Sequence, residues 1–375
     1  MRCKQDLLKV TYVFWILLLS LSVIGCQPEQ LAQLIPPATE APTMADTANG
    51  TTDVGYEVQS AIFDYNQRLG RGINLGNALE APMEGAWGVV LQPAYFSLIK
   101  AAGFDSVRIP IRWSVYASRR EPYTIRDTIF DRVDWAIEQA HQNDLAVVIN
   151  VHHFDRLIDD PDGQLERFLM IWEQIAAHYQ DYPDTVYFEI LNEPHDTLTA
   201  NRWNDYALQA LTIIRETNPT RPVIIGPVEW NSISQLYRLE LPEDDRNIIV
   251  TIHYYSPFQF THQGAEWVDG SANWLGTPWT ASVGQRQAVI EDFQVAVRWA
   301  EKENRPLYLG EFGAYSKADT ESRIRWTEFV RTEAEKQGMS WAYWEFGAGF
   351  GVYDRVTNTW RDDLLSALVS NSSEE

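Results

Sequence analysis

The chain has 375 residues, 45% of them hydrophobic, and a formal net charge of −22. This acidic balance argues against a nucleic-acid partner, which would need a basic surface, and suits a soluble protein with a neutral or cationic substrate. The 15 Trp, 17 Tyr and 15 Phe give a large supply of rings, which pack cores and also line sugar-binding clefts.

The first 25 residues have the pattern of an export signal. A positive start from Arg2 to Lys9 precedes an apolar run at 10–24, which is short for a bilayer span of about 20 residues and predicts a signal peptide. The sequence Val23-Ile24-Gly25-Cys26 resembles a bacterial lipobox. We therefore expect a lipoprotein signal peptide over 1–25 and an exported protein, lipid-anchored to the cell envelope through Cys26. An ordinary signal peptide and secretion are the alternative.

Residues 26–55 differ in composition from the rest. They are rich in Pro, Ala, Thr, Gln and Asp and lack apolar periodicity, which predicts a flexible tether. Cys3 and Cys26 are the only cysteines, so we expect no disulfide in the folded part. Residues 56–375 are then expected to form a single folded domain.

From residue 56 onward, short β-rich runs alternate with amphipathic helical stretches. The predicted strands lie at 71–75, 106–110, 145–151, 186–191, 222–226, 248–253, 307–310 and 340–344. The predicted helices lie at 93–102, 128–143, 165–179, 203–217, 285–304, 319–337 and 362–369. Eight strands alternating with helices predict a single (β/α)8 TIM barrel of the α/β class. A doubly wound open sheet is the alternative, and the lack of a glycine-rich phosphate loop after the first strand disfavours it.

Chemistry in such barrels lies at the carboxyl ends of the strands. The fourth predicted strand stops at Asn192-Glu193, just before Pro194, and Glu311 follows the seventh. A glutamate at one strand end is also compatible with a plain solvated position. Two glutamates facing each other across a barrel mouth, flanked by tryptophan, instead indicate glycoside hydrolysis.

Other chemistries fit the sequence less well. His152 and His153 are neighbours on a strand and point to opposite faces, so they cannot both hold one ion, and no HExxH motif is present. The GxSxG elbow of serine hydrolases is missing, and none of the predicted strands contains a lysine for Schiff-base chemistry. We expect neither a metal nor any other cofactor.

Side-chain alternation refines the fourth strand. Glu189, Leu191 and Glu193 share one parity and are predicted to face the barrel lumen. Glu189 would lie one layer below Glu193 as a structural carboxylate paired with a cation. Glu345 has the opposite parity to Trp344 and is interpreted as structural.

Several motifs together resemble glycoside hydrolase family 5, in the clan with catalytic glutamates on strands four and seven. They are FEILNEP at 188–194, GEFG at 310–313, VRIP at 107–110, IHYY at 252–255 and WAYWE at 341–345. The likeness runs from about Ala61 to Leu368. Within the family, RGINLGNALE at 71–80 and HQGAEW at 262–267 are most similar to bacterial endo-β-1,4-glucanases, some of which also cleave β-mannans.

The resemblance implies a role for each site residue. Glu193 would be the general acid/base and Glu311 the nucleophile of a retaining double displacement, so the pKa of Glu193 should be raised while that of Glu311 stays low. The resemblance assigns substrate binding or support to a larger set: Arg108, His152, His153, Asn192, His253, Tyr255, Trp344, Asn77, Glu80, His262 and Trp267.

The function expected is endo-acting cleavage of cellulose-type β-1,4-glucan, with mannan or glucomannan as a second substrate. The alternatives are an endo-β-1,4-mannanase, a mixed-linkage glucanase, an enzyme that transfers to sugar, or a carbohydrate-binding surface protein without turnover. A β-linked polysaccharide or oligosaccharide would be the partner, with no nucleic acid and with membrane contact only through the lipid on Cys26. We expect a monomer.

Overall fold

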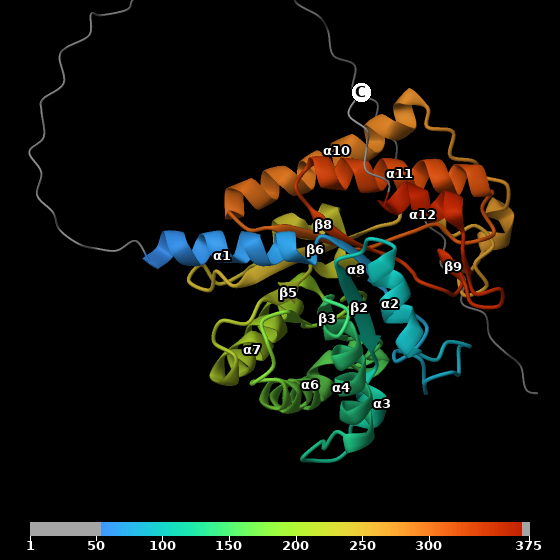
Figure 1. Ribbon diagram of the computed structural model, residues 1–375. Coiled ribbons are helices and arrows are strands. Elements are labelled where there is room, and N and C mark those ends of the chain that lie inside the picture. The colour runs from blue at the N-terminus through green and yellow to red at the C-terminus, as the bar shows by residue number, and fades with distance from the viewer. Residues whose placement is uncertain (1–53, 370–375) are drawn as a thin grey trace, which may run out of the picture. The chain divides into compact units, whose positions relative to one another are not determined.

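The computed structural model describes residues 54–369, and within them eight parallel strands close into a barrel in sequence order (Figure 1). This confirms the predicted (β/α)8 architecture. The barrel strands are β1 Arg71–Asn74, β2 Ser106–Ile111, β3 Ala146–Val151, β4 Val186–Glu189, β5 Val223–Ile225, β6 Ile248–Tyr254, β7 Leu307–Phe312 and β8 Ser340–Tyr343.

Helices surround the barrel, with α10 beside α11 on one flank and α6 beside α7 on another (Figure 1). Each turns an apolar stripe inward; in α4, Ile129, Val133 and Ile137 recur at helical spacing and are buried. The longer helices are α2 Pro93–Ala101, α4 Asp127–His141, α6 Pro161–His178, α7 Ala200–Thr217, α10 Val283–Glu303, α11 Thr320–Lys336 and α12 Asp362–Val369. Short helical turns occupy the loops: α3 Trp113–Tyr116, α5 Asp155–Asp159, α8 Val228–Asn231, η1 Ile233–Arg238, α9 Phe258–Thr261 and η2 Ser271–Trp274. A small hairpin pairs β9 Tyr353–Asp354 with β10 Thr359–Trp360.

The helix α1, Val54–Leu69, was not predicted. Its buried Ile62 and Leu69 pack in one cluster with residues from the amino-terminal half of the barrel, among them Val148, Tyr187 and Tyr308. Asn66 adds two hydrogen bonds, donating to the Leu307 carbonyl at 3.1 Å and accepting from the Ser340 hydroxyl at 2.7 Å. The amino-terminal end of the barrel is therefore covered, which leaves the carboxyl end for a site.

Two register shifts lie next to that end. The pairing of β6 with β7 shifts between Ile252 and His253, so that His253 lies opposite Glu311 rather than Gly310. A second shift separates Leu309 from Phe312 in the pairing of β7 with β8. Such irregularities re-aim side chains near active sites.

The predicted signal peptide at 1–25 and nearly all of the predicted tether at 26–55 lie outside the described residues. Helix α1 begins at Val54, two residues before the expected domain boundary. Among residues 54–369, no helix has both the length and the apolar character that crossing a bilayer requires.

Candidate active site

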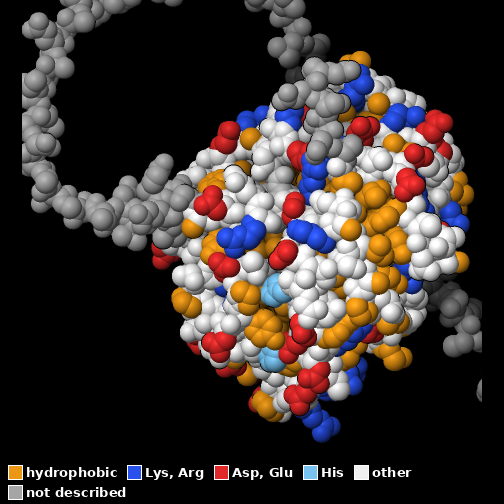
Figure 2. All heavy atoms as spheres, in the orientation of Figure 1, with side chains coloured by type: hydrophobic (Ala, Val, Ile, Leu, Met, Phe, Trp, Pro, Cys, Tyr) orange, Lys and Arg blue, Asp and Glu red, His pale blue; other side chains and the backbone are white. Residues whose placement is uncertain are grey.

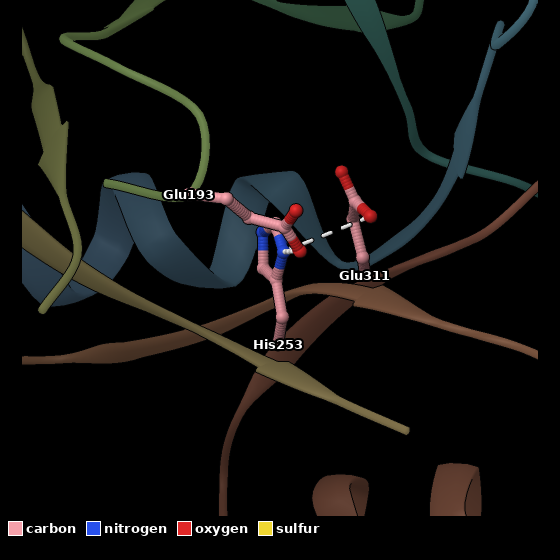
Figure 3. A group of neighbouring side chains, drawn as sticks. All are labelled: Glu193, His253 and Glu311. Carbon is pink, nitrogen blue, oxygen red and sulfur yellow. Dashed lines mark hydrogen bonds and ion pairs between the residues drawn. The ribbon is translucent and has the colours of Figure 1, made fainter. Parts of the chain in front are cut away.

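Glu193, His253 and Glu311 converge at the carboxyl end of the barrel (Figure 3). Glu311 lies in β7, His253 lies in β6 and Glu193 follows β4. One oxygen of each glutamate and one nitrogen of His253 all lie within 4.8 Å of one another. Retaining glycosidases place their carboxyl groups about 5–5.5 Å apart and inverting enzymes about 6.5–9.5 Å apart, so the geometry matches a retaining pair.

The chain leaves the strand pattern before it reaches Glu193. Strand β4 ends at Glu189, and Leu191 packs in the apolar core between barrel and helices instead of facing the lumen, so its predicted orientation was wrong. Glu193 has a positive φ of 47°, a conformation that glutamate rarely adopts. Side-chain parity fails here because it holds only while the backbone stays extended.

Arg108 organises the floor of the site from strand β2. Its guanidinium forms a two-pronged ion pair with Glu189, Nε to Oε2 at 2.6 Å and Nη2 to Oε1 at 2.7 Å, which confirms Glu189 as a paired structural carboxylate. It also donates to Asn74 at 2.8 Å, to Asn192 at 2.7 Å and to Glu311 at 2.8 Å. Because both Arg108 and Glu189 are fully buried, the pair fixes the positions of everything that Arg108 touches.

Glu311 is held on both carboxylate oxygens. Arg108 donates to Oε1 at 2.8 Å, and the Tyr255 hydroxyl donates to Oε2 at 2.9 Å. Burial is the largest influence and raises the pKa of Glu311, while His253, Arg108 and the Tyr255 hydrogen bond act in the opposite direction. The expected low pKa was therefore wrong in direction, because sequence reasoning counted the cation and not the loss of water.

Glu193 is more exposed to solvent than Glu311, with 23% of its side chain exposed against 6%. Its Oε1 lies 2.7 Å from Nδ1 of His253. Burial raises the pKa of Glu193 to about 7, with Arg108 the strongest opposing influence. A carboxyl group with this pKa is still largely protonated in mildly acidic solution and is suited to act as a general acid.

His152 and Trp344 form an aromatic surface beside the two glutamates. Their rings are nearly parallel, 5° apart, with centroids separated by 5.9 Å. Nδ1 of His152 lies 3.1 Å from the amide nitrogen of Asn150, so it must accept, and the ring proton lies on Nε2. His153 lies edge-on to Trp87, with ring centroids 5.7 Å apart. Burial lowers the pKa of both histidines, so neither carries a charge at neutral pH.

The loop after β6 carries two further predicted residues. His262 is buried, stacks on Phe258 with ring centroids 4.1 Å apart, and meets the edge of Tyr255 at 4.9 Å. It therefore supports Tyr255, whose hydroxyl donates to Glu311. Trp267 is 61% exposed and lies edge-on to Tyr315, which leaves an indole surface available to a bound chain.

Asn77 and Glu80 lie in the loop after β1. Glu80 is only 1% exposed, and its carboxylate accepts from the backbone N–H groups of Asn77 and Ala78. Glu345 is buried in the same manner and accepts from the N–H groups of Gly347, Ala348 and Phe350. Both glutamates therefore hold their loops together by accepting backbone N–H groups. A structural role of this kind was expected for Glu345 only.

Three site residues were not singled out from the sequence. Asn74 accepts from Arg108, Trp87 packs against His153, and Asn231 contacts His253. Asn74 could have been found, since it sits in β1 at the layer of Arg108. Trp87 and Asn231 lie on irregular loops, where no periodicity reports which way a side chain points.

Glu193, His253 and Glu311 also form a donor set that a divalent ion would accept. Their contacts are already explained by hydrogen bonds and by the charge of Arg108. The absence of a metal stays a prediction. On the described part of the face in Figure 2, acidic and basic side chains are interspersed without a continuous basic field.

A (β/α)8 barrel with paired glutamates after strand four and in strand seven defines a glycosidase of the retaining type. The family described as Cellulase (glycosyl hydrolase family 5) matches residues 71–349. This chain therefore belongs to glycoside hydrolase family 5.

Relatives and solved structures agree with this assignment. The chain is 36% identical to Endoglucanase H of Acetivibrio thermocellus over 92% of its own length, but it spans only 38% of that protein. It is 30% identical to Endoglucanase B of Clostridium cellulovorans, covering 77% of this chain and 70% of that protein. Structures of Thermotoga maritima Cel5A with cellobiose and with mannotriose are 55% identical, with a TM-score of 0.81, and cover 82% of this chain and 99% of theirs.

Proposed function

We propose that this protein is an endo-β-1,4-glucanase that hydrolyses cellulose-type glucan with retention of anomeric configuration. The observation that carries the proposal is the pair of opposed glutamates, with Glu311 bound to Arg108 and Glu193 bound to neutral His253. The endoglucanase relatives support the β-1,4-glucan substrate.

The reaction proceeds in two displacements. A Glu311 oxygen bonds to the anomeric carbon, the glycosidic C–O bond breaks, and its oxygen takes the proton of Glu193. The Glu193 carboxylate then removes a proton from water, whose oxygen attacks the same carbon and releases Glu311. Asn192 accepts from Arg108 at 2.7 Å, and the family resemblance implies that it holds the sugar 2-hydroxyl while charge develops.

Substitution of each glutamate tests the assignment. Glu311→Gln and Glu193→Gln should each reduce release of reducing ends from soluble β-1,4-glucan by more than about a hundredfold, because nucleophile and acid are lost in turn. Thermal unfolding checks that both variants remain folded, and Glu328→Gln, at an exposed position of α11, serves as the control. Full activity in either glutamine variant would refute the roles. No activity in the natural protein would favour a carbohydrate-binding protein instead.

We propose mannan or glucomannan as a second substrate. The support is a related protein, Thermotoga maritima Cel5A, which is 55% identical and has been solved with mannotriose as well as cellobiose. Glucan and mannan differ in the orientation of the 2-hydroxyl, the group that the family resemblance assigns to Asn192. Initial rates on carboxymethylcellulose, mixed-linkage glucan, glucomannan and mannan decide the order. A rate on mannan above that on every glucan would make the protein a mannanase.

We further propose that the protein is exported and held in the cell envelope by a lipid on Cys26. The support is the apolar run at 10–24 and the lipobox-like sequence that ends at Cys26. Incorporation of labelled palmitate into the natural chain, lost in Cys26→Ser, would agree with the anchor. Unlabelled protein in the culture medium would indicate secretion.

A further inference from the structure

Three consecutive residues after strand β5 adopt a backbone conformation that side-chain-bearing residues seldom accept. Glu229, Trp230 and Asn231 have φ values of 55°, 58° and 55°. Left-handed residues are usually single, and a run of three persists only where the surroundings over-determine it. Strain of this kind concentrates at functional sites, and this turn contacts His253 through Asn231.

The turn sends neighbouring side chains in opposite directions. Trp230 is 49% exposed and stacks on the ring of His195, with centroids 4.9 Å apart and planes at 17°. Asn231 is fully buried at the end of β5. A Cβ added at Gly226 would lie 2.3 Å from its amide oxygen, so Asn231 packs directly on the strand end.

The buried side-chain amide of Asn231 contacts the imidazole of His253, which in turn contacts Glu193. Nδ2 of Asn231 lies 3.2 Å from Nε2 of His253, whose other nitrogen, Nδ1, lies 2.7 Å from Oε1 of Glu193. An amide nitrogen only donates, so Nε2 must accept, and the ring proton must lie on Nδ1. That proton is then donated to Oε1 of Glu193.

The other charged groups around His253 are those of the catalytic floor. Oε2 of Glu311 lies 3.6 Å from Nδ1, and Arg108 and Glu189 lie beyond it. Burial lowers the pKa of His253 to about 4, so the ring is neutral while the enzyme works. A neutral imidazole has two tautomers, and only its partners select one.

We propose that Asn231 is a positioning residue that fixes His253 as the Nδ1-protonated tautomer and thereby confines the transferable proton of Glu193 to Oε2. Oε1 is occupied as an acceptor, so the acid must deliver its proton from the other oxygen. This proposal rests on the proposed function, since it assigns the oxygen from which the acid acts.

Two substitutions of Asn231 are compatible with its left-handed backbone conformation. Asn231→Gly accepts the left-handed turn and removes the donor. Asn231→Asp also tolerates the turn but supplies only an acceptor, which favours a second ring proton and a positive His253. Asn358→Gly is the matched control, because Asn358 has a φ of 56° in an exposed turn.

Two substrates with different leaving groups distinguish a loss of acid catalysis from a general loss of activity. For Asn231→Gly, kcat/KM on an unactivated cello-oligosaccharide should fall about tenfold or more, whereas kcat/KM on 2,4-dinitrophenyl β-cellobioside should change less than about threefold, because that leaving group needs no proton. For Asn231→Asp, the basic limb of the cello-oligosaccharide pH profile should move to lower pH by about one unit, because a cation beside Glu193 lowers its pKa. Asn358→Gly should change neither measurement.

A spectroscopic measurement on the natural protein tests the proposal even if a variant fails to fold. With 15N-labelled histidine, His253 should show the chemical shifts of a neutral ring protonated at Nδ1, its signals being assigned by comparison with His253→Gln. A ring protonated at Nε2 would overturn the proposal, as would equal losses on both substrates in Asn231→Gly. Either result leaves hydrolysis by the natural enzyme intact, so it is distinct from failure of the proposed function.

Discussion

The basic limb of the pH profile is the most direct consequence of the geometry around Glu193. Burial raises the pKa of this carboxyl from 4.5 to about 7. At pH 7 about half of the enzyme then carries the acid proton, against about 0.3% for an unshifted carboxyl, a gain of about 150-fold. Above pH 7 the protonated fraction falls about tenfold per unit, and kcat/KM on cello-oligosaccharides should fall with it.

The assay compares two substrates across pH 4–10. With a cello-oligosaccharide, kcat/KM of the natural enzyme should decline above about pH 7; with 2,4-dinitrophenyl β-cellobioside the decline should be weak. In Glu193→Gln the limb should disappear, because the titrating group is gone. Burial also raises the pKa of Glu345 to about 7 and that of Glu80 to about 8. If a limb near pH 7 survives in Glu193→Gln, the titrating group would be Glu345 or Glu80 rather than Glu193. That result would refute the reasoning.

Three further substitutions probe separate parts of the site. Gly310→Ala should lower kcat and cost about 1–3 kcal/mol of stability, since the new Cβ would lie 2.5 Å from the Thr251 hydroxyl and 3.1 Å from His253; kinetics and chemical denaturation measure both. Tyr255→Phe should raise the pKa of Glu311 by removing a 2.9 Å hydrogen bond, so the acidic limb of kcat/KM should move to higher pH. Trp267→Ala should raise KM for long glucans severalfold with little change in kcat, since the exposed indole contributes binding away from the reacting bond; an unchanged KM would contradict a platform role.

The sequence predicted the barrel and the two facing glutamates because regular strands leave a periodic record that shows where each strand ends. All eight strands and the seven expected helices were found near their predicted positions. The helix α1 was missed, since its apolar positions follow a segment read as a tether. Its role, covering the barrel end with Ile62 and Leu69, depends on contacts far along the chain.

Predictions failed where the chain leaves its strands. Leu191 was assigned to the lumen by parity, but β4 ends at Glu189, and a left-handed residue at Glu193 turns the carboxylate inward. Asn231 was not noticed because nothing in its neighbourhood marks a left-handed turn. The sequence also did not predict that burial raises the pKa of Glu311, because the packing around this carboxylate depends on residues from the whole barrel mouth.

The charged groups at the floor of the site allow a last test of what sets the pKa of Glu193. Arg108 is the cation there, and it contacts both Glu189 and Glu311. Glu189 and Glu311 both pair with this one guanidinium, so a carboxylate charge on Glu193 would add a third negative group around it. Glu189 thus raises the pKa of Glu193 although the two do not touch. In Glu189→Gln the guanidinium is less neutralised, so the basic limb of kcat/KM should move to lower pH. The variant is also expected to lose about 3–5 kcal/mol of stability, because a buried ion pair is broken. A folded variant with an unmoved limb would mean that Glu193 is kept protonated by burial alone.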